Sequence, residues 1–194
     1  GVKVANEIRG TFTQMGHGMP LTLKAGKPLY NRPQTPQPPF PYKTEEVTFV
    51  NPHDQASLSG TISYPVDYER GKTPVVLLVT GSGLQNRDEE IFEHRPFAVI
   101  ADYLARNGVA TLRYDDRSVG KSTGDVKNAT TATYAQDAEA GLKYLRDTKA
   151  FGKVGLLGHS EGGTIAFILA GAGKTDFIVS LAGTAIRGDK VLVG

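Results

Sequence analysis

Hydrophobic and polar positions divide the chain into three zones. In residues 1–24, apolar and polar side chains alternate loosely on either side of a Gly-His-Gly interruption at residues 16–18. A period of two residues is typical of strands with one apolar face, so this zone predicts a β-hairpin. An isolated hairpin is only marginally stable in water, and we therefore expect it to need packing partners elsewhere in the protein.

Proline dominates the second zone, residues 25–43. Proline fixes its own φ and disfavours helical geometry for the residue before it. The zone therefore predicts an extended linker without a helix or a central strand. A polyproline II docking motif is the functional alternative for the same composition.

The third zone, residues 44–194, alternates apolar runs with amphipathic stretches. Residues 74–80 are almost continuously apolar, which is typical of a strand covered on both faces in a parallel sheet. Residues 96–107 place apolar side chains on one face of a helix that Gly108 is suited to end. Further strands are predicted at residues 46–50, 58–64, 109–114, 154–157 and 177–181, and further helices from about residue 133 and over residues 162–170.

The order of these elements predicts the fold class. Strands that alternate with helices imply crossover connections, so we expect an α/β domain with a doubly wound, mainly parallel sheet. The second helix has Thr133 and Gln136 at the spacing of a capping box, which predicts that the helix begins near Thr133.

Composition narrows the classes of function. The chain contains 22 Lys and Arg and 20 Asp and Glu, and this balance gives no reason to expect nucleic acid or an anionic membrane surface as a partner. The absence of cysteine excludes a disulfide scaffold, a thiolate nucleophile and a cysteine-ligated metal. No apolar run reaches about eighteen residues, so no membrane span is expected.

The first residues, Gly-Val-Lys-Val, lack both an initiator Met and the charged-then-apolar pattern of a signal peptide. We therefore expect the 194 residues to be a piece of a longer protein, which a signal could precede.

The strongest chemical signal is Gly-His-Ser-Glu-Gly-Gly at residues 158–163. It follows an apolar strand and precedes a small-residue helix, which is the context of the G-x-S-x-G nucleophile elbow. Such a turn projects the serine hydroxyl from the edge of the sheet, and side chains in place of Gly158 and Gly162 would collide with backbone. We therefore predict Ser160 as a catalytic nucleophile, the alternative being a glycine-rich turn with an incidental serine.

An acyl-transfer site also needs donors for the oxyanion, and the loop after the strand at residues 74–80 is suited to supply one. The loop reads Thr-Gly-Ser-Gly-Leu, and its glycines let backbone approach a substrate closely. We predict the backbone N–H groups of Ser82 and Glu161 as the two donors, with Gly83 or Leu84 next in place of Ser82. A plain turn is the structural alternative, and a phosphate-binding loop is disfavoured because no Gly-Lys-Ser/Thr follows.

The other members of a serine-hydrolase triad are not evident. A serine nucleophile needs a histidine as base and an acid that orients the histidine. In proteins with a G-x-S-x-G elbow, both residues follow the serine in the sequence. No histidine follows Ser160, and the four in the chain precede it: His17, His53, His94 and His159. We do not expect Asp176 or Asp189 to be the triad acid, because each lies close to the strand that directly follows the elbow.

Two of the histidines lie near the expected site. We predict that His94 and His159, together with Gly83 and Leu84, border a possible pocket. The alternatives are a solvated loop position for His94 and a packed or turn-exposed position for His159, whose side chain should point away from the serine hydroxyl.

A polar cluster, Asp-Asp-Arg-Ser-Val-Gly-Lys-Ser, occupies residues 115–122. Paired carboxylates are compatible with a metal, but no histidine or third carboxylate stands at ligand spacing. We instead expect Asp115, Asp116 and Arg117 to bond the loop backbone and one another beside the elbow. Neither a metal nor any other cofactor is expected.

Four segments serve as landmarks: residues 80–88, 112–117, 120–124 and 158–163. Together they resemble bacterial α/β-hydrolase-fold serine hydrolases of the serine-aminopeptidase-like group, especially secreted or lipoprotein-type esterases of Bacteroidetes. The resemblance implies a periplasmic or secreted location and an incomplete hydrolase domain over residues 44–194, without its cap, acid and histidine. It also implies that residues 1–24 are the remnant of a small N-terminal β domain. Ser118 stands where many relatives have glycine.

Two classes of function fit these observations. The first is a serine hydrolase that cleaves a small-molecule carboxylic ester through an acyl-enzyme, with a peptidase or a thioesterase of the same fold as alternatives. The second is a non-catalytic binding or interaction module, which the missing histidine favours for the 194 residues alone. A truncated sheet leaves apolar surface uncovered, so we also expect association with a missing C-terminal fragment or self-association.

Overall fold

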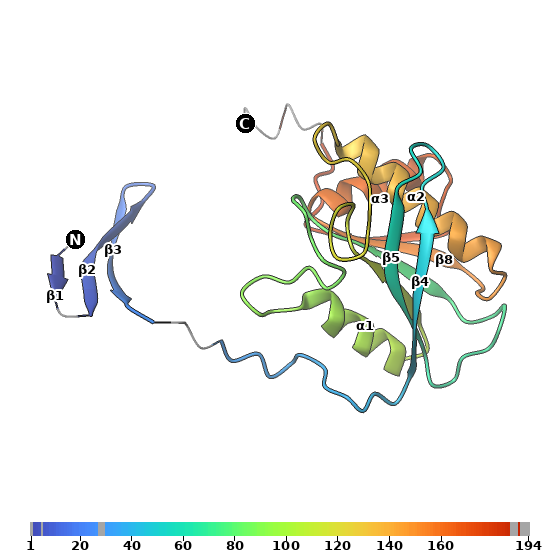
Figure 1. The fold of residues 1–194 in the computed structure, drawn as a ribbon, viewed down its shortest axis with the longest axis horizontal. Coiled ribbons are helices and arrows are strands. Elements are labelled where there is room, and N and C mark those ends of the chain that lie inside the picture. Colours follow the sequence, from blue (N-terminus) through green and yellow to red (C-terminus); the bar gives the residue numbers. More distant parts are fainter. Residues whose placement is uncertain (1, 5, 27–29, 187–189, 191–194) are drawn as a thin grey trace. The chain divides into compact units, whose positions relative to one another are not determined.

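The computed structural model describes residues 2–4, 6–26, 30–186 and 190, and the chain divides into two compact units, Gly1–Asn31 and Arg32–Gly194. The described part of the first unit is an antiparallel sheet of three strands, here called the N-terminal sheet (Figure 1). Its strands are β1 (Val2–Val4), β2 (Glu7–Gln14) and β3 (His17–Lys24). β2 and β3 form the predicted hairpin. β1 was not predicted, because three residues are too few to show a periodic pattern.

The N-terminal sheet is amphipathic. Ile8 pairs with Leu23 and Phe12 pairs with Met19, and residues opposite one another on antiparallel strands share a face. The apolar side chains of this face remain 40–53% exposed. They are Ile8, Phe12, Met19, Leu21 and Leu23.

The proline-rich zone has the expected local structure where it is described. Residues 30–42 contain neither helix nor strand, and they lead into β4 (Lys43–Val50). The second unit begins at Arg32, inside the zone predicted as a linker.

The described residues of the second unit form an α/β domain around a six-stranded sheet, here called the central sheet, with the order β4-β5-β7-β6-β8-β9. Neighbouring strands from β7 to β9 are parallel, whereas β4 and β5 add an antiparallel edge. This confirms the predicted doubly wound, mainly parallel class. The remaining strands are β5 (Ser57–Tyr64), β6 (Val75–Val79), β7 (Ala110–Tyr114), β8 (Val154–His159) and β9 (Phe177–Leu181). The helices are α1 (Pro96–Arg106), α2 (Thr131–Asp147) and α3 (Glu161–Gly171).

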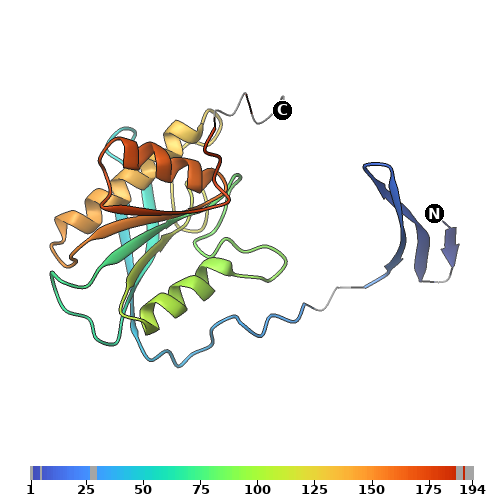
Figure 2. The same ribbon diagram turned by 180° about the vertical axis from the view of Figure 1, so that it is seen from behind.

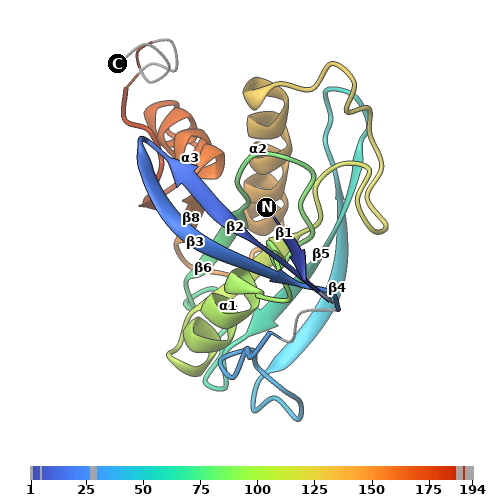
Figure 3. The same ribbon diagram turned by 90° about the vertical axis from the view of Figure 1, so that its left-hand side faces the viewer.

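Helices cover both faces of the central sheet. α1 lies on one face, and α2 and α3 lie together on the other (Figures 2 and 3). β6 is buried along its whole length, and its alternating side chains contribute to two different cores. Val75, Leu77 and Val79 belong to the core under α2 and α3, whereas Val76 and Leu78 belong to the core that includes Phe97 of α1. The near-continuous apolar run therefore reflects burial on two sides.

The topology places two strand ends side by side. β6 lies between β7 and β8, and Val79 pairs with Gly158 at the carboxyl ends of β6 and β8. From these ends the chain leads to α1 on one face and to α3 on the other. In open α/β sheets such a switch point is where the crevice for a ligand forms.

The start of α2 differs from the sequence prediction. The helix begins at Thr131, and Thr130 is its extended N-cap residue. The hydroxyl of Thr133 accepts a hydrogen bond from the Thr130 amide, so the capping pair is Thr130 with Thr133 rather than Thr133 with Gln136. The sequence at the start of α2 contains several threonines, so either Thr130 or Thr133 could serve as the N-cap. The extended conformation of Thr130 identifies it as the N-cap residue.

No helix in the part of the chain that the structure describes is long and apolar enough to cross a membrane.

Candidate active site

Ser160 occupies the sharp turn between β8 and α3. Its backbone has φ 52° and ψ −113°, a conformation that L-residues rarely adopt and that costs about 1–3 kcal/mol. Hydrogen bonds hold it from both sides, because its amide donates to Leu181 O at 2.8 Å and its carbonyl accepts from the Gly163 and Thr164 amides. Ser160 is exposed, and its hydroxyl has no hydrogen-bond partner among the described residues.

Glycines make this turn sterically feasible. A Cβ on Gly158 would lie 1.9 Å from Gly162 O, and a Cβ on Gly162 would lie 2.2 Å from Val79 O. Gly163 also lies close to backbone, since its Cβ would lie 2.7 Å from Gly183 Cα. These are backbone contacts that no side-chain rotation relieves. The elbow therefore packs directly on the end of β6 and on the segment after β9.

The loop after β6, residues 80–85, lies against the elbow. A Cβ on Gly81 would lie 3.2 Å from Ser160 Cβ, so the loop passes within van der Waals distance of the serine. Ser82, Gly83 and Leu84 are exposed, and their amides have no acceptor among the described residues. The amide of Glu161, at the first position of α3, likewise has no acceptor there.

Asp116 ties the two ends of this loop together. Its carboxylate accepts the Thr80 hydroxyl at 3.0 Å and the Gln85 amide at 2.9 Å. Burial raises the pKa of Asp116 to about 7, although the hydrogen bonds from Gln85 and Thr80 oppose the rise. A neutral fraction of this carboxyl is therefore present near neutral pH.

Asp115 anchors the segment that follows the loop. It accepts the Arg87 amide at 2.8 Å and the Arg87 guanidinium at 2.7 Å. Arg87 also reaches Glu46 of β4 at 2.7 Å, so it connects the loop to the antiparallel edge of the central sheet.

Arg117 does not bond its neighbouring aspartates, which corrects one expectation from the sequence. It is 1% exposed and binds Asp137 of α2 through two nitrogens, at 2.7 and 2.8 Å, and Asp54 at 2.8 Å. Asn51 donates to Asp137 as well. The hydrogen bonds with Asp137 raise the pKa of Arg117 above its usual value. The cluster thus stabilises the loop through partners distant in sequence.

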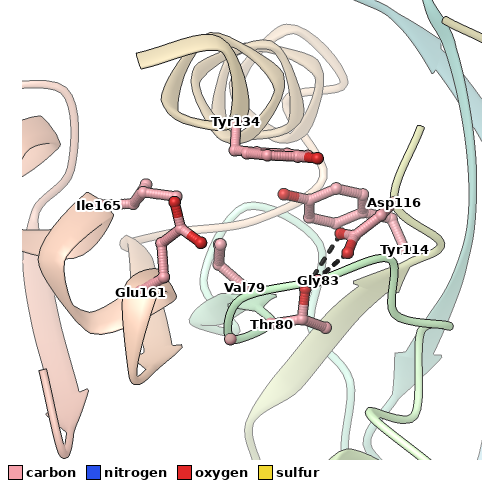
Figure 4. Close-up of a pocket in the computed structure, with 9 residues that line it drawn as sticks. Val79, Thr80, Gly83, Tyr114, Asp116, Tyr134, Glu161 and Ile165 are labelled. Atoms are coloured by element: carbon pink, nitrogen blue, oxygen red, sulfur yellow. Dashed lines mark hydrogen bonds between the residues drawn. The ribbon is translucent and has the colours of Figure 1, made fainter. Parts of the chain in front are cut away.

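A cavity opens beside the loop and the elbow (Figure 4). Tyr134 of α2 and Tyr114 of β7 lie next to Asp116, and Glu161 of α3 lies across from them. Burial raises the pKa of Tyr114 well above its ordinary value. The complete lining consists of Val79, Thr80, Gly81, Gly83, Tyr114, Asp116, Tyr134, Glu161 and Ile165.

The residues predicted to border a pocket separate in the structure. Gly83 lines the cavity, whereas Leu84 lies on the exposed loop beside it. His159 turns to Glu89, with Nδ1 2.8 Å from Glu89 Oε1. His94 pairs through its backbone with Ile91, and its Nδ1 is buried without a partner among the described residues.

Asp176, a candidate acid after Ser160 in the sequence, lies away from the serine. Asp176 accepts the Val154 amide at 2.7 Å, a hydrogen bond that lowers the pKa of Asp176. Val154 begins β8 and Ser160 follows its end, so Asp176 lies at the opposite end of the sheet from the serine. Asp189 falls outside the described residues.

Glu89 is the residue of this region that sequence reasoning missed. Its Oε1 accepts the Gly81 amide at 2.7 Å as well as Nδ1 of His159. In the sequence it stands in the charged run Arg-Asp-Glu-Glu at residues 87–90, which resembles a solvated loop. Only the adjacency of the β6 and β8 ends brings its partners together.

The sheet order and the serine at the switch point define the α/β-hydrolase class of folds. Residues 93–190, about half of the chain, match the family described as serine aminopeptidase, S33, and the chain belongs to this family.

Individual relatives carry esterase and acyltransferase names. The chain is 32% identical to esterase EstD of Thermotoga maritima over 125 residues, which cover 64% of this chain and 30% of EstD. It is 28% identical to an acyl transferase of Photobacterium leiognathi over 107 residues, which cover 55% of this chain and 32% of that protein. The chain thus spans about a third of the length of these curated relatives.

A solved structure agrees on the fold. An α/β serine hydrolase of Xanthomonas campestris superimposes with a TM-score of 0.58 at 22% identity, over 78% of this chain and 66% of that one.

Proposed function

We propose that the protein containing this chain is a serine hydrolase that cleaves carboxylic esters through an acyl-enzyme, with Ser160 as the nucleophile. The observation that carries the proposal is the conformation of Ser160. It has a positive φ, an exposed hydroxyl and a position between β8 and α3, beside the free amides of the loop after β6. Backbone strain of this kind persists where the surrounding structure over-determines it, and it clusters at active sites.

The proposed chemistry follows from the groups around the serine. Ser160 Oγ attacks the ester carbonyl carbon while its proton passes to the histidine base proposed below, and the carbonyl π electrons move to the carbonyl oxygen. The amides of Ser82 and Glu161 then donate to this oxyanion, and the N-terminal dipole of α3 favours the same charge. When the tetrahedral intermediate collapses, the same histidine returns the proton to the departing oxygen, the bond to the alcohol breaks, and the acyl group remains on Ser160. Water then attacks the acyl-enzyme in the same way, with Ser160 Oγ as the leaving group, and releases the carboxylic acid.

The base and its acid are part of the proposal. No histidine follows Ser160, and among the described residues His159 is hydrogen-bonded to Glu89. The nucleophile, acid and histidine follow in that order in the α/β-hydrolase fold. We therefore propose that the acid and the histidine come from sequence outside these 194 residues. The chain spans only about a third of the length of its curated relatives, which supports this proposal.

Labelling with a fluorophosphonate probe tests the nucleophile. The full-length protein should be labelled, and Ser160→Ala should abolish both labelling and hydrolysis of p-nitrophenyl esters. Ser118→Gly is the matched control, because it removes another exposed serine hydroxyl at a positive φ of 62°, where glycine fits. Labelling that persists in Ser160→Ala would reject Ser160 as the nucleophile.

The second class of function, a non-catalytic module, is supported by the missing histidine for the 194 residues alone. We accordingly expect the isolated chain to hydrolyse p-nitrophenyl acetate no faster than the buffer does, within about threefold, because an unassisted serine hydroxyl is a weak nucleophile. Robust turnover by the isolated chain that depends on Ser160 would contradict the proposed origin of the base.

A further inference from the structure

We infer that Glu89 is a positioning residue that sets the geometry of the oxyanion hole, because one of its carboxylate oxygens binds the backbone of the loop after β6, at Gly81, and a side chain of the elbow, His159. The inference rests on the proposed serine-hydrolase function and adds a residue to it.

Each hydrogen bond of Glu89 is made by the residue that directly precedes a proposed functional residue in the sequence. Oε1 of Glu89 accepts the Gly81 amide at 2.7 Å, and Gly81 precedes Ser82. The same atom lies 2.8 Å from His159 Nδ1, and His159 precedes Ser160. A shift of either segment relative to the other would lengthen one of these bonds. One atom therefore fixes the separation between the loop after β6 and the elbow.

Packing around Gly81 shows how close these groups are. A Cβ on Gly81 would lie 3.1 Å from Glu89 Oε1, 3.2 Å from Ser160 Cβ and 3.4 Å from His159 Nδ1. The three groups thus converge on the same side of one glycine. Gly81 lets the carboxylate reach the amide while the loop remains in contact with Ser160.

Glu89 stands in this position at an energetic cost. It is 8% exposed, and His159 is the basic side chain that pairs with it among the described residues. A buried carboxylate costs free energy unless hydrogen bonds compensate, and a positive φ of 51° adds strain to a residue that is not glycine. A negative charge near a developing oxyanion is itself unfavourable. The hydrogen bonds to Gly81 and His159 offset these costs.

Glu89 and Asp116 divide the work of holding the loop. Asp116 joins Thr80 to Gln85 and so sets the shape of the loop itself. Glu89 joins the loop to the elbow. Shape and placement are separate requirements for two amides that must point at one oxygen atom.

The bond also specifies the tautomer of His159. A carboxylate oxygen is an acceptor, and Oε1 already receives the Gly81 N–H, so the proton in the bond to His159 resides on Nδ1. Side-chain nitrogen NMR of the full-length protein should therefore find His159 with a protonated Nδ1 at neutral pH. Removal of the carboxylate should release this preference.

Steady-state kinetics of the full-length protein provide the decisive test, with active sites counted by fluorophosphonate titration. Glu89→Leu keeps similar volume and removes the acceptor, and it should lower kcat per active site by about 10²-fold or more while KM changes by less than about threefold. His159→Ala should lower kcat by about tenfold, because it removes the bond from Glu89 to the elbow and leaves the bond from Glu89 to the Gly81 amide. Glu93→Leu, at an exposed position of the same connection between β6 and α1, is the control and should keep wild-type kcat.

A double variant separates positioning from general stability. Since His159 acts through Glu89, Glu89→Leu with His159→Ala should lose no more activity than Glu89→Leu alone. Multiplicative losses, or wild-type kcat in Glu89→Leu, would overturn the inference. Should Glu89→Leu fail to fold, wild-type kcat in His159→Ala overturns it instead, since His159 is half-exposed and tolerates truncation. Turnover that survives Ser160→Ala would refute the proposed function, a result distinct from all of these.

Discussion

The two sheets of this protein use apolar side chains in opposite ways. In the N-terminal sheet, the apolar residues of the face that includes Ile8 and Leu23 stay 40–53% exposed. In the central sheet, all five residues of β6 are buried, and helices pack on both sides. The N-terminal sheet therefore gains less from its own packing, whereas the central sheet is rigid enough to hold Ser160 in a strained conformation.

The elbow is held by close backbone contacts, and adding a methyl group at such a contact should give the largest loss of unfolding free energy. Gly162→Ala places a Cβ 2.2 Å from Val79 O, so we expect a loss of about 5 kcal/mol in unfolding free energy, or failure to fold. Gly171→Ala in the same helix is the control, because nothing lies within 4 Å of its Cβ. Urea unfolding measures both, and an equally stable Gly162→Ala would contradict the close approach of the elbow to β6.

Ion pairs also differ between the two sheets. Asp137→Ala leaves the buried Arg117 without its main partner, and we expect a loss of about 3–5 kcal/mol. Glu7→Ala in the N-terminal sheet breaks a pair with Arg9 of the same 2.7–2.8 Å length, but Arg9 is 64% exposed. That change should cost less than about 1 kcal/mol. Equal losses in urea unfolding would show that burial does not distinguish the two pairs.

Leucines provide a comparison without charge. Leu77 of β6 is fully buried, and Leu77→Ala should lower the unfolding free energy by about 2–5 kcal/mol. Leu21 of β3 is 40% exposed, so Leu21→Ala should change it by less than about 1 kcal/mol. A large effect at Leu21 in thermal or urea unfolding would mean that the exposed face of the N-terminal sheet is covered in solution.

The last expected effect is a pH dependence. Burial raises the pKa of Asp116 to about 7, above the value of about 4 in an unfolded chain. The folded state then holds a proton that the unfolded state has lost, so this group's contribution to stability is full below about pH 4 and is lost as pH rises through about 7. Asp116→Asn cannot ionise and keeps an acceptor for Thr80 and Gln85. Its unfolding free energy should fall less between pH 5 and pH 8 than that of the wild type, and identical slopes would contradict the raised pKa.

The parts of the fold that local patterns encode could be predicted from the sequence. The run at residues 74–80 signalled a strand buried on both faces, and the alternation in residues 1–24 signalled the hairpin. Periodicity placed α1 to within one residue of its end. Each of these features depends on neighbours in the chain, which is why the pattern is sufficient.

Features that depend on contacts between distant residues were missed. The carboxylate partners of Arg117 are 63 and 20 residues away, and adjacency in sequence wrongly suggested Asp115 and Asp116. One signal was present, because Asp137 stands three residues after Tyr134 and four before Gly141, on the apolar face of α2. For Glu89 no local signal existed, since its partners are 8 and 70 residues away.

The central claim is that Ser160 presents a reactive hydroxyl at the switch point between β6 and β8, and peptide mapping tests it most directly. Full-length protein inactivated by a fluorophosphonate is digested with trypsin, which releases residues 154–174, a peptide whose sole serine is Ser160. We expect the phosphonyl adduct on this peptide, at one group per protein molecule. An adduct on any other peptide, or an active enzyme whose residues 154–174 stay unmodified, would contradict it.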